Sequence, residues 1–234
     1  MSWLALLNDQ VVGGWARIRR RRRIRNLPPV TNVNIGSGVL VAPGWLNVDV
    51  SIASLFSSSP RPFLKFIYRI MPSSSAIKRD LAEQEFCELL RKHKFIHHDV
   101  RFGLPFPDAS VDFLYSSHFL EHLYRVEVLA LLQEARRVLK PTGIFRICVP
   151  DLEYAMTLWQ KGVKDRALQY FFFDRDVSSF TRHRYLWDFE SLREVLEKAG
   201  FSSVERCRFQ VGQTPDLQVL DNRPDETLYV EAHP

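Results

Sequence analysis

The stretch VNIGSGVLVAPGWLNVDVS, residues 33–51, decides the fold of this chain. A short apolar run ends in Gly36-Ser37-Gly38, and a second apolar run ends in an acidic residue, Asp49. This order is typical of the first two strands of a nucleotide-binding α/β unit. The link between the runs is shorter than the roughly ten residues that a crossover helix needs. The sequence therefore predicts a shortened first crossover, formed by a loop with one helical turn.

The composition indicates one globular domain, because 234 residues with 46% hydrophobic content can bury a sizeable core. The net charge of +5 is concentrated near the N-terminus, which favours a local anionic contact, and no specific nucleic-acid partner is expected. Three cysteines without metal-ligand spacing favour a reducing, cytoplasmic compartment. No run is apolar enough to cross a bilayer, and the N-terminus does not resemble a secretory signal.

Alternating strand-like and helix-like patterns predict an α/β domain. Strands are expected at residues 31–35, 45–50, 95–98, 111–117, 144–149, 203–211 and 227–232, with the last two forming an antiparallel pair. A helix is expected at 125–139, where apolar residues recur at three-and-four spacing. A second helix begins after the N-cap Asp188 and ends at Gly200.

We divide the chain into an N-terminal amphipathic and basic helix at 1–27 and a domain at 28–234, with insertions at about 52–93 and 151–185. The arginines Arg19–Arg23 follow an apolar stripe, which suits an anionic membrane surface or a polyanionic partner. A solvated helix end is an equally good interpretation. The aromatic run at 170–173 favours core or lid packing over a base-stacking platform.

Four predicted strands end in residues that could contact a ligand at one edge of the sheet. Glycines at 36 and 38 would let the backbone approach a ligand closely. Asp49 could accept hydrogen bonds from a ribose diol, and Asp99 could accept one from an exocyclic amine. Each feature alone is weak, since a GSG is more often a turn and an aspartate is often a cap. Their order along the chain makes the combined signal strong.

Five stretches in order carry a family resemblance: VNIGSG, LNVDVS, HHDVRFGLPFPDASVDFLYSSHFLEHL, LLQEARRVLKPTGIFRICVPDLE and LREVLEKAGF. Together they resemble the class I S-adenosylmethionine-dependent methyltransferases, most closely a type 11-like branch acting on small molecules and glycans. The resemblance covers about 31–234 apart from the two insertions. It implies a Rossmann-like, seven-stranded, mostly parallel sheet with the last strand antiparallel and helices on both faces. It also implies S-adenosyl-L-methionine as the cofactor and a small-molecule or lipid-linked glycan acceptor.

The resemblance implies roles for the strand-end residues. Asp49 would hold the ribose hydroxyls, and Asp99 with the backbone of Val100 would hold the adenine. The glycine loop would pass under the methionine part of the cofactor, and two serines at the end of the fourth strand would border the transferred methyl. The loop residues are Asn34, Gly36, Ser37 and Gly38, and the serines are Ser116 and Ser117.

Two departures from the family pattern affect the glycine loop. The family commonly has an acid where this chain has Asn34, and a third glycine where this chain has Leu40. Asn34 can form hydrogen bonds but contributes no charge towards the cofactor's ammonium group. The site is therefore predicted to function with fewer of the family's loop residues. A catalytically silent module with the same fold remains an alternative.

Candidate catalytic residues follow the fourth strand and lie in the second insertion. We expect the chain to turn helical after Ser117, so that His118, Glu121 and His122 share a face. His118, oriented by a carboxylate, could then accept a hydroxyl proton. His183 stands between two arginines, Arg182 and Arg184, that could anchor an anionic acceptor. Alternatively, His122 is a structural helix residue and His183 lies in a solvated turn; no metal site is expected.

Three functions remain open from the sequence. The first is a methyltransferase acting on a small molecule or glycan. The second is a silent module with the methyltransferase fold. The third is a membrane- or RNA-associated methyltransferase that uses the arginine cluster.

Overall fold

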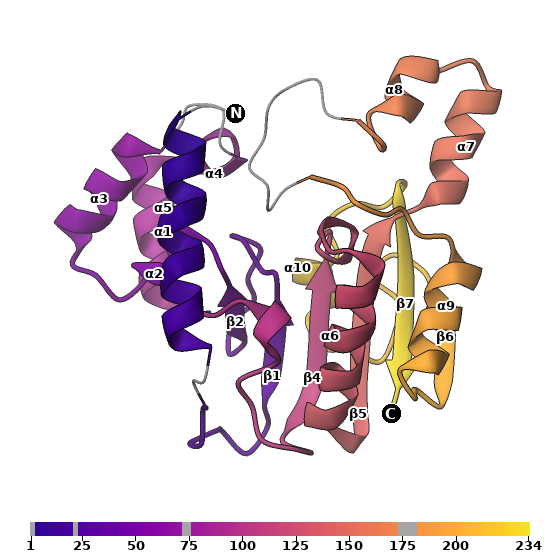
Figure 1. The fold of residues 1–234 in the computed structure, drawn as a ribbon, viewed down its shortest axis with the longest axis horizontal. Coiled ribbons are helices and arrows are strands. Elements are labelled where there is room, and N and C mark those ends of the chain that lie inside the picture. The colour runs from indigo at the N-terminus through magenta and orange to yellow at the C-terminus, as the bar shows by residue number, and fades with distance from the viewer. Residues whose placement is uncertain (1–2, 21–22, 72–75, 173–181) are drawn as a thin grey trace.

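The structure, a computed structural model, describes residues 3–20, 23–71, 76–172 and 182–234. Within these residues a seven-stranded sheet has the strand order β3-β2-β1-β4-β5-β7-β6 (Figure 1). Strand β7 runs antiparallel to β5 and β6, and the other neighbouring pairs are parallel. The predicted fold class is confirmed. The strands are β1 (Asn32–Ile35), β2 (Leu46–Asp49), β3 (Lys94–His97), β4 (Val111–Ser117), β5 (Leu139–Pro150), β6 (Ser203–Cys207) and β7 (Thr227–His233).

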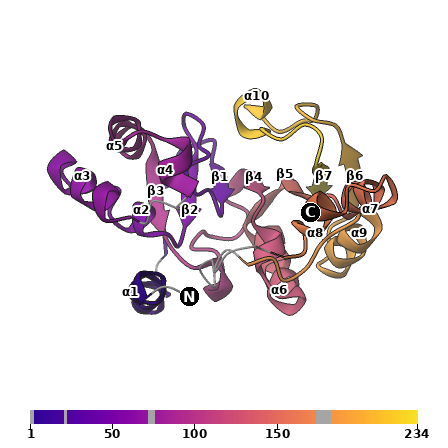
Figure 2. The same cartoon turned by 90° about the horizontal axis from the view of Figure 1, so that it is seen from above.

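Helices cover both faces of this sheet. Figure 2 shows α1, α6 and α9 on one side of it, and α5 and α10 on the other. The helices are α1 (Trp3–Arg19), α2 (Ile52–Leu55), α3 (Arg61–Ile70), α4 (Ala76–Asp80), α5 (Glu83–Lys92), α6 (Arg125–Val138), α7 (Leu152–Gln160), α8 (Lys164–Leu168), α9 (Phe189–Lys198) and α10 (Leu217–Leu220), with short 3₁₀ helices η1 (Val100–Phe102) and η2 (Leu120–His122).

The main core lies between the sheet and helices α6 and α9, and α6 buries the apolar residues whose three-and-four spacing predicted it. Asp188 caps α9 as predicted, because its carboxylate accepts from the Ser191 amide at 2.8 Å. A smaller cluster centred on Leu64, Phe86 and Leu90 joins the helices of the 52–93 segment. Helices α2 and α5 contact β3, so this segment packs beside the β3 edge of the sheet.

Two predicted strands differ from the structure by more than one residue at an end. β5 starts at Leu139, five residues earlier than expected, because Leu139 already has an extended backbone (ψ 140°) and the chain passes directly from α6 into the sheet. β6 ends at Cys207 and does not reach 211, because Arg208 and Val211 bridge to each other and turn the chain away.

The first crossover is short, as predicted, but the expected helical turn is absent: the described residues 36–45 form turns only. Asn34 holds this loop, since its buried side-chain amide donates to the Leu40 carbonyl at 2.8 Å. The Gly38 amide donates to the Asp49 carboxylate at 2.9 Å and ties the loop to β2. A carboxylate at position 34 could not donate to Leu40, which explains why an amide fits the shortened loop.

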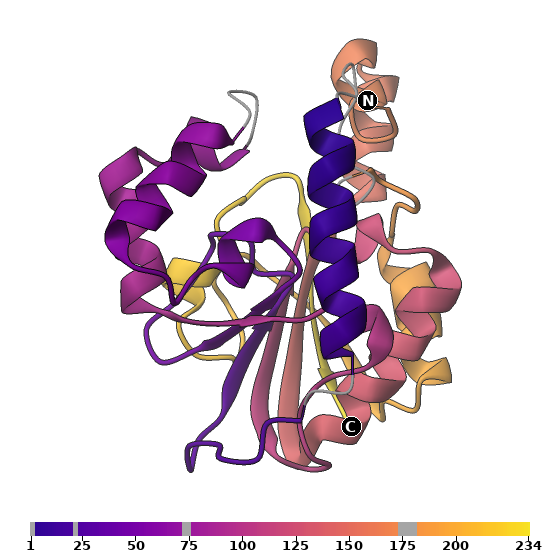
Figure 3. The same ribbon diagram turned by 60° about the vertical axis from the view of Figure 1, so that its left-hand side comes forward.

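The N-terminal helix α1 stands beside the sheet (Figure 3) and ends at Arg19, short of the predicted end at residue 27. Ala16 is buried, whereas Trp15 and Ile18 are exposed. Arg21 and Arg22 of the predicted arginine cluster lie outside the described residues, as do Phe173 and the rest of 173–181 in the second insertion. Among the described residues, no helix combines the length and hydropathy that crossing a membrane requires.

Candidate functional site

The parallel strands bring the predicted ligand residues to one edge of the sheet. β1 lies between β2 and β4, with Ile35 opposite Val48 and Asn34 opposite Tyr115. β3 lies on the far side of β2, with His97 opposite Asp49. Because these four strands share a direction, their carboxyl ends and the loops that follow face the same edge. The structure therefore brings the glycine loop, Asp49, the segment at Asp99 and the end of β4 together.

The glycine loop is held close to the end of β4 by one aromatic ring. Gly36 has a positive φ of 64°, and a Cβ atom added there would overlap the Phe119 side chain. Gly38 also has a positive φ (51°), but a Cβ atom there would meet no heavy atom of the described residues within 4 Å. Both the positive φ and the contact with Phe119 thus require a glycine at position 36. At Gly38 the space beside the backbone is open, and a ligand could approach it.

Asp49 ends β2 and faces the glycine loop. Its Oδ2 accepts from the Gly38 amide at 2.9 Å, and its Oδ1 accepts from the Ser51 amide at 2.6 Å. A carboxylate offers about four acceptor positions, so each oxygen can accept a further bond. The half-buried carboxylate can therefore support the loop and still bind a diol.

Asp99 is nearly buried and is already engaged in an ion pair. Its carboxylate accepts from the Arg101 amide at 3.0 Å and from the Arg101 Nη2 at 2.7 Å, and this pairing raises the pKa of Arg101. An exocyclic amine would have to share the Asp99 carboxylate with this guanidinium. Val100 follows in η1 and is buried.

Two serine hydroxyls at this edge suit a polar ligand. The Ser37 and Ser116 Oγ atoms are buried without a hydrogen-bond partner among the described residues. Buried hydroxyls are normally paired. Ser117 is half-buried, and Asn34 uses its amide nitrogen inside the loop. The open space at Gly38, the Asp49 acceptors and the two hydroxyls fit a nucleoside cofactor.

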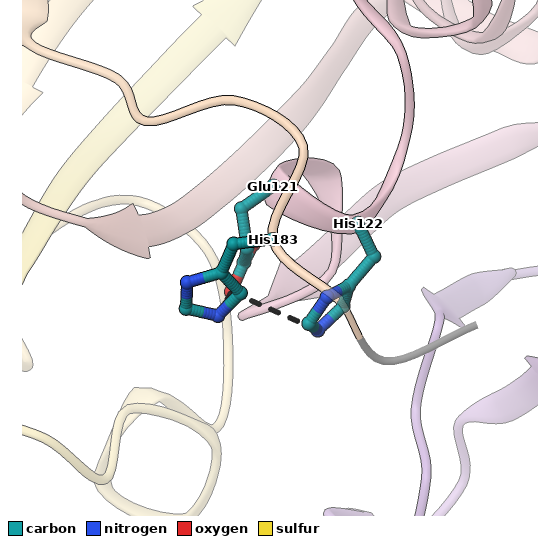
Figure 4. Close-up of side chains that lie close together, drawn as sticks. All are labelled: Glu121, His122 and His183. Atoms are coloured by element: carbon teal, nitrogen blue, oxygen red, sulfur yellow. Dashed lines mark ion pairs between the residues drawn. The ribbon is translucent and has the colours of Figure 1, made fainter. Parts of the chain in front are cut away.

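All four predicted catalytic residues meet in one cluster, which we call the histidine cluster: His118, Glu121, His122 and His183. Glu121 is fully buried at its centre, and Oε1 lies 3.6 Å from His118 Nδ1, 4.0 Å from His122 Nε2 and 3.9 Å from His183 Nε2. Figure 4 shows Glu121, His122 and His183 pointing toward one another from two segments of the chain.

The local backbone of this cluster differs from the prediction. The chain does not turn helical directly after Ser117, because His118 adopts a left-handed conformation (φ 48°) and only η2 follows. The interpretation of His183 as a solvated turn residue was wrong: its side chain is 15% exposed, and its Nδ1 lies 2.8 Å from the Tyr170 carbonyl. The chain around it is fixed by the Arg184 amide, which donates to the Glu121 carbonyl at 2.7 Å.

Burial controls the charge of the histidine cluster. Loss of solvent raises the pKa of Glu121 to about 8 and lowers the pKa of His118 to about 3 and of His122 to about 4. The pKa of His183 is lowered for the same reason. At neutral pH the imidazoles are therefore neutral, and a proton on Glu121 is favoured over an isolated buried carboxylate.

Sequence reasoning missed Arg223 and Thr227, which complete the surroundings of His118. The Arg223 Nη1 lies 3.4 Å from His118 Nδ1, and the Thr227 hydroxyl lies 3.0 Å from His118 Nε2. Both residues come from the C-terminal part of the chain, more than a hundred positions away, and no local motif marks them. With both ring nitrogens engaged and a pKa of about 3, His118 is a weak base at neutral pH.

A hollow of about 680 Å³ lies elsewhere, beside Leu46 and Lys94 at the amino ends of β2 and β3. The predicted ligand residues lie at the carboxyl ends of the same strands. We therefore assign the functional site to the convergent polar groups and not to this hollow.

A comparison with known protein families matches residues 52–147 to a methyltransferase domain. The match covers the end of β4, η2 and α6, and it begins after Asp49, so it leaves out the glycine loop. Together with the strand order, this decides the fold. The chain has a class I methyltransferase fold. A comparison with curated proteins finds no significant match.

Solved structures are similar to this chain at low sequence identity. A SAM-dependent methyltransferase from Archaeoglobus fulgidus is 15% identical with a TM-score of 0.48, and 100% of each chain is covered. A protein from Bordetella parapertussis is 15% identical with a TM-score of 0.50 over 98% of this chain and 69% of its own. A longer protein from Nostoc punctiforme is 14% identical with a TM-score of 0.48, over 96% of this chain and 56% of its own.

Proposed function

We propose that this protein transfers a methyl group from S-adenosylmethionine to a small-molecule or glycan acceptor. The observation that carries the proposal is the edge of the methyltransferase fold where the glycine loop, Asp49 and the histidine cluster converge. The cofactor, when bound, supplies a methyl group activated on a positively charged sulfur. The protein's own task is then to bind, orient and exclude water.

The cofactor side is assigned to the carboxyl ends of β1 to β4. Asp49 holds the ribose hydroxyls with the acceptor positions left free by the Gly38 and Ser51 amides. Asp99 and the Val100 backbone face the adenine. The hydroxyls of Ser37 and Ser116 are available as donors and acceptors to the bound ligand.

The acceptor side is assigned to the histidine cluster and the arginines beside it. His118, the first residue of the cluster, directly follows Ser117 at the end of β4, which places the cluster beside the cofactor edge. The Arg184 Cζ atom lies 4.3 Å from the centroid of the Tyr124 ring, and Arg184 Nη1 donates to the Tyr124 hydroxyl at 2.8 Å. Arg184, held in this way, and the exposed Arg182 would offer positive charge to an anionic acceptor.

Two alternatives lead to different outcomes. A silent binding module would keep the fold without binding the cofactor, and the pairing of Asp99 with Arg101 is the feature that favours it. A membrane-associated or RNA-associated enzyme would use Arg19–Arg23, and the exposed Trp15 and Ile18 on α1 favour the membrane. Vesicle binding that persists after removal of α1 would exclude the membrane role of that helix.

Asp49→Ala is expected to weaken S-adenosylhomocysteine binding by about 1–3 kcal/mol, because the variant loses a charged acceptor for the ribose hydroxyls. Titration calorimetry with the purified protein measures this difference. Since alanine also removes the tie to Gly38, Asp49→Asn is measured beside it and should lose less affinity. The exposed Asp108, which pairs with Arg137, provides the control Asp108→Ala. An unchanged dissociation constant for Asp49→Ala would move the ribose anchor elsewhere.

A further inference from the structure

The histidine cluster contains an arrangement that a hydrogen-bonding role alone does not explain. The Nε2 atoms of His122 and His183 both approach Oε1 of Glu121, at 4.0 and 3.9 Å. These three ligand atoms lie within 4.8 Å of one another. We propose that Glu121, His122 and His183 bind one divalent transition-metal ion, with Zn²⁺ as the best match to two imidazoles and a carboxylate.

The hydrogen bonds of the two rings fix which nitrogen faces inward. His122 Nδ1 lies 3.3 Å from the Arg182 carbonyl, and His183 Nδ1 lies 2.8 Å from the Tyr170 carbonyl. A carbonyl can only accept, so each Nδ1 carries the proton and each Nε2 carries a lone pair. Metal-bound histidines almost always donate their second N–H to a carbonyl or carboxylate in this way. Both rings are therefore oriented as metal ligands.

The carboxylate at the centre supplies the second observation. Glu121 is fully buried, and neither Oε1 nor Oε2 has a hydrogen-bond partner among the described residues. A divalent cation held beside the two Nε2 atoms would compensate this buried, unpartnered carboxylate.

The distances allow a metal after a small closure. With bonds of about 2.0–2.1 Å in a tetrahedral site, ligand atoms lie roughly 3.3 Å apart. The observed separations of 3.9 and 4.0 Å exceed that value by less than one ångström, which side-chain rotation can supply. The scaffold is already fixed, since the Arg184 and Tyr185 amides donate to the Glu121 carbonyl and join the two segments.

His118 is a neighbour of this site and not a ligand. Its Nδ1 faces the Arg223 guanidinium and its Nε2 contacts Thr227. The Arg223 guanidinium in turn pairs with Glu226 at 3.6 Å. Three protein ligands leave a coordination position for water or an acceptor oxygen, whose proton a metal would make more acidic. This last role rests on the proposed methyl transfer, but the metal site itself does not.

The test uses the full chain stripped with a chelator, then titrated with Zn²⁺ and, as a spectroscopic probe, with Co²⁺. We expect one equivalent bound and visible Co²⁺ absorption typical of four-coordinate nitrogen and oxygen ligands. Glu121→Gln, which preserves volume, and His183→Ala should each weaken binding by more than about 100-fold, beyond the loss expected from removing a supporting hydrogen bond. The control variants His93→Ala and His118→Ala should bind within about threefold of the unaltered protein.

Two results would overturn the metal site. One is unaltered protein that binds no more Zn²⁺ or Co²⁺ than Glu121→Gln does. The other is binding that His118→Ala abolishes and His183→Ala leaves intact. If a variant does not fold, the Co²⁺ spectrum of the unaltered protein still decides, because absorption typical of hydrated six-coordinate Co²⁺ contradicts the site. S-adenosylhomocysteine calorimetry on the stripped protein is recorded in parallel, so failure of the metal site and failure of the cofactor proposal remain distinct.

Discussion

Arg146→Met is expected to lower the free energy of unfolding by about 3–5 kcal/mol, the cost of removing one partner from a buried ion pair. Arg146 lies on β5 with a fully buried side chain, and its Nη2 contacts Asp221 Oδ2 at 2.6 Å. It also donates to the Val211 and Arg208 carbonyls at 3.0 and 2.9 Å. The substitution leaves the Asp221 carboxylate buried without its cation and releases the 208–221 segment from the sheet.

Urea unfolding followed by circular dichroism measures the effect of Arg146→Met. The matched control is Arg206→Met on the neighbouring strand β6, whose half-exposed side chain pairs with Glu153 at 2.9 Å. An ion pair at the surface contributes at most about 1 kcal/mol, so the control should change little. If Arg146→Met unfolds within about 1 kcal/mol of the control, the buried pair does not hold this segment.

Gly36→Ala is expected to cost about 2–5 kcal/mol of stability and to abolish cofactor binding at accessible concentrations. Roughly 1–2 kcal/mol comes from placing a side chain at positive φ, and about 1–3 kcal/mol comes from overpacking against Phe119. The displaced loop would also move the Gly38 amide away from Asp49. Thermal unfolding and S-adenosylhomocysteine calorimetry measure the two consequences.

Gly38→Ala is the matched control for this prediction, because residue 38 has a similar φ but open space where the Cβ atom would stand. Gly38→Ala should lose the stability associated with positive φ but not the stability associated with overpacking. The double variant Gly36→Ala/Phe119→Ala lacks the overlapping ring. Adding Gly36→Ala to Phe119→Ala should therefore cost less stability than adding it to the unaltered protein. Equal destabilisation by the two single glycine variants would show that Phe119 does not press on the loop.

The elements with a clear hydrophobic period could be predicted from the sequence. β4 has the predicted bounds, α6 buries the stripe predicted from its spacing, and α9 begins after the predicted N-cap Asp188. The stretch 144–149 of β5 is apolar apart from Arg146, and no local pattern indicates that this arginine is buried. Its partner Asp221 is far away in the chain, so a local pattern cannot identify the pair.

The site was predictable in its members but not in its geometry. The strand-end order pointed to Asp49 and Asp99, yet the ion pair that occupies Asp99 depends on the turn of η1. His183 was named as a candidate, but its approach to Glu121 depends on tertiary contacts with the Tyr170 and Glu121 carbonyls. The left-handed backbone at His118 also escaped prediction, because such conformations are rare outside glycine.

The most direct test of the central claim is titration calorimetry of S-adenosylhomocysteine into the purified 234-residue chain. The account predicts saturable binding of one ligand per chain, with a dissociation constant below the millimolar range and weaker binding by Asp49→Ala. A folded protein that shows no binding at millimolar ligand would contradict the account and leave a silent module with the methyltransferase fold.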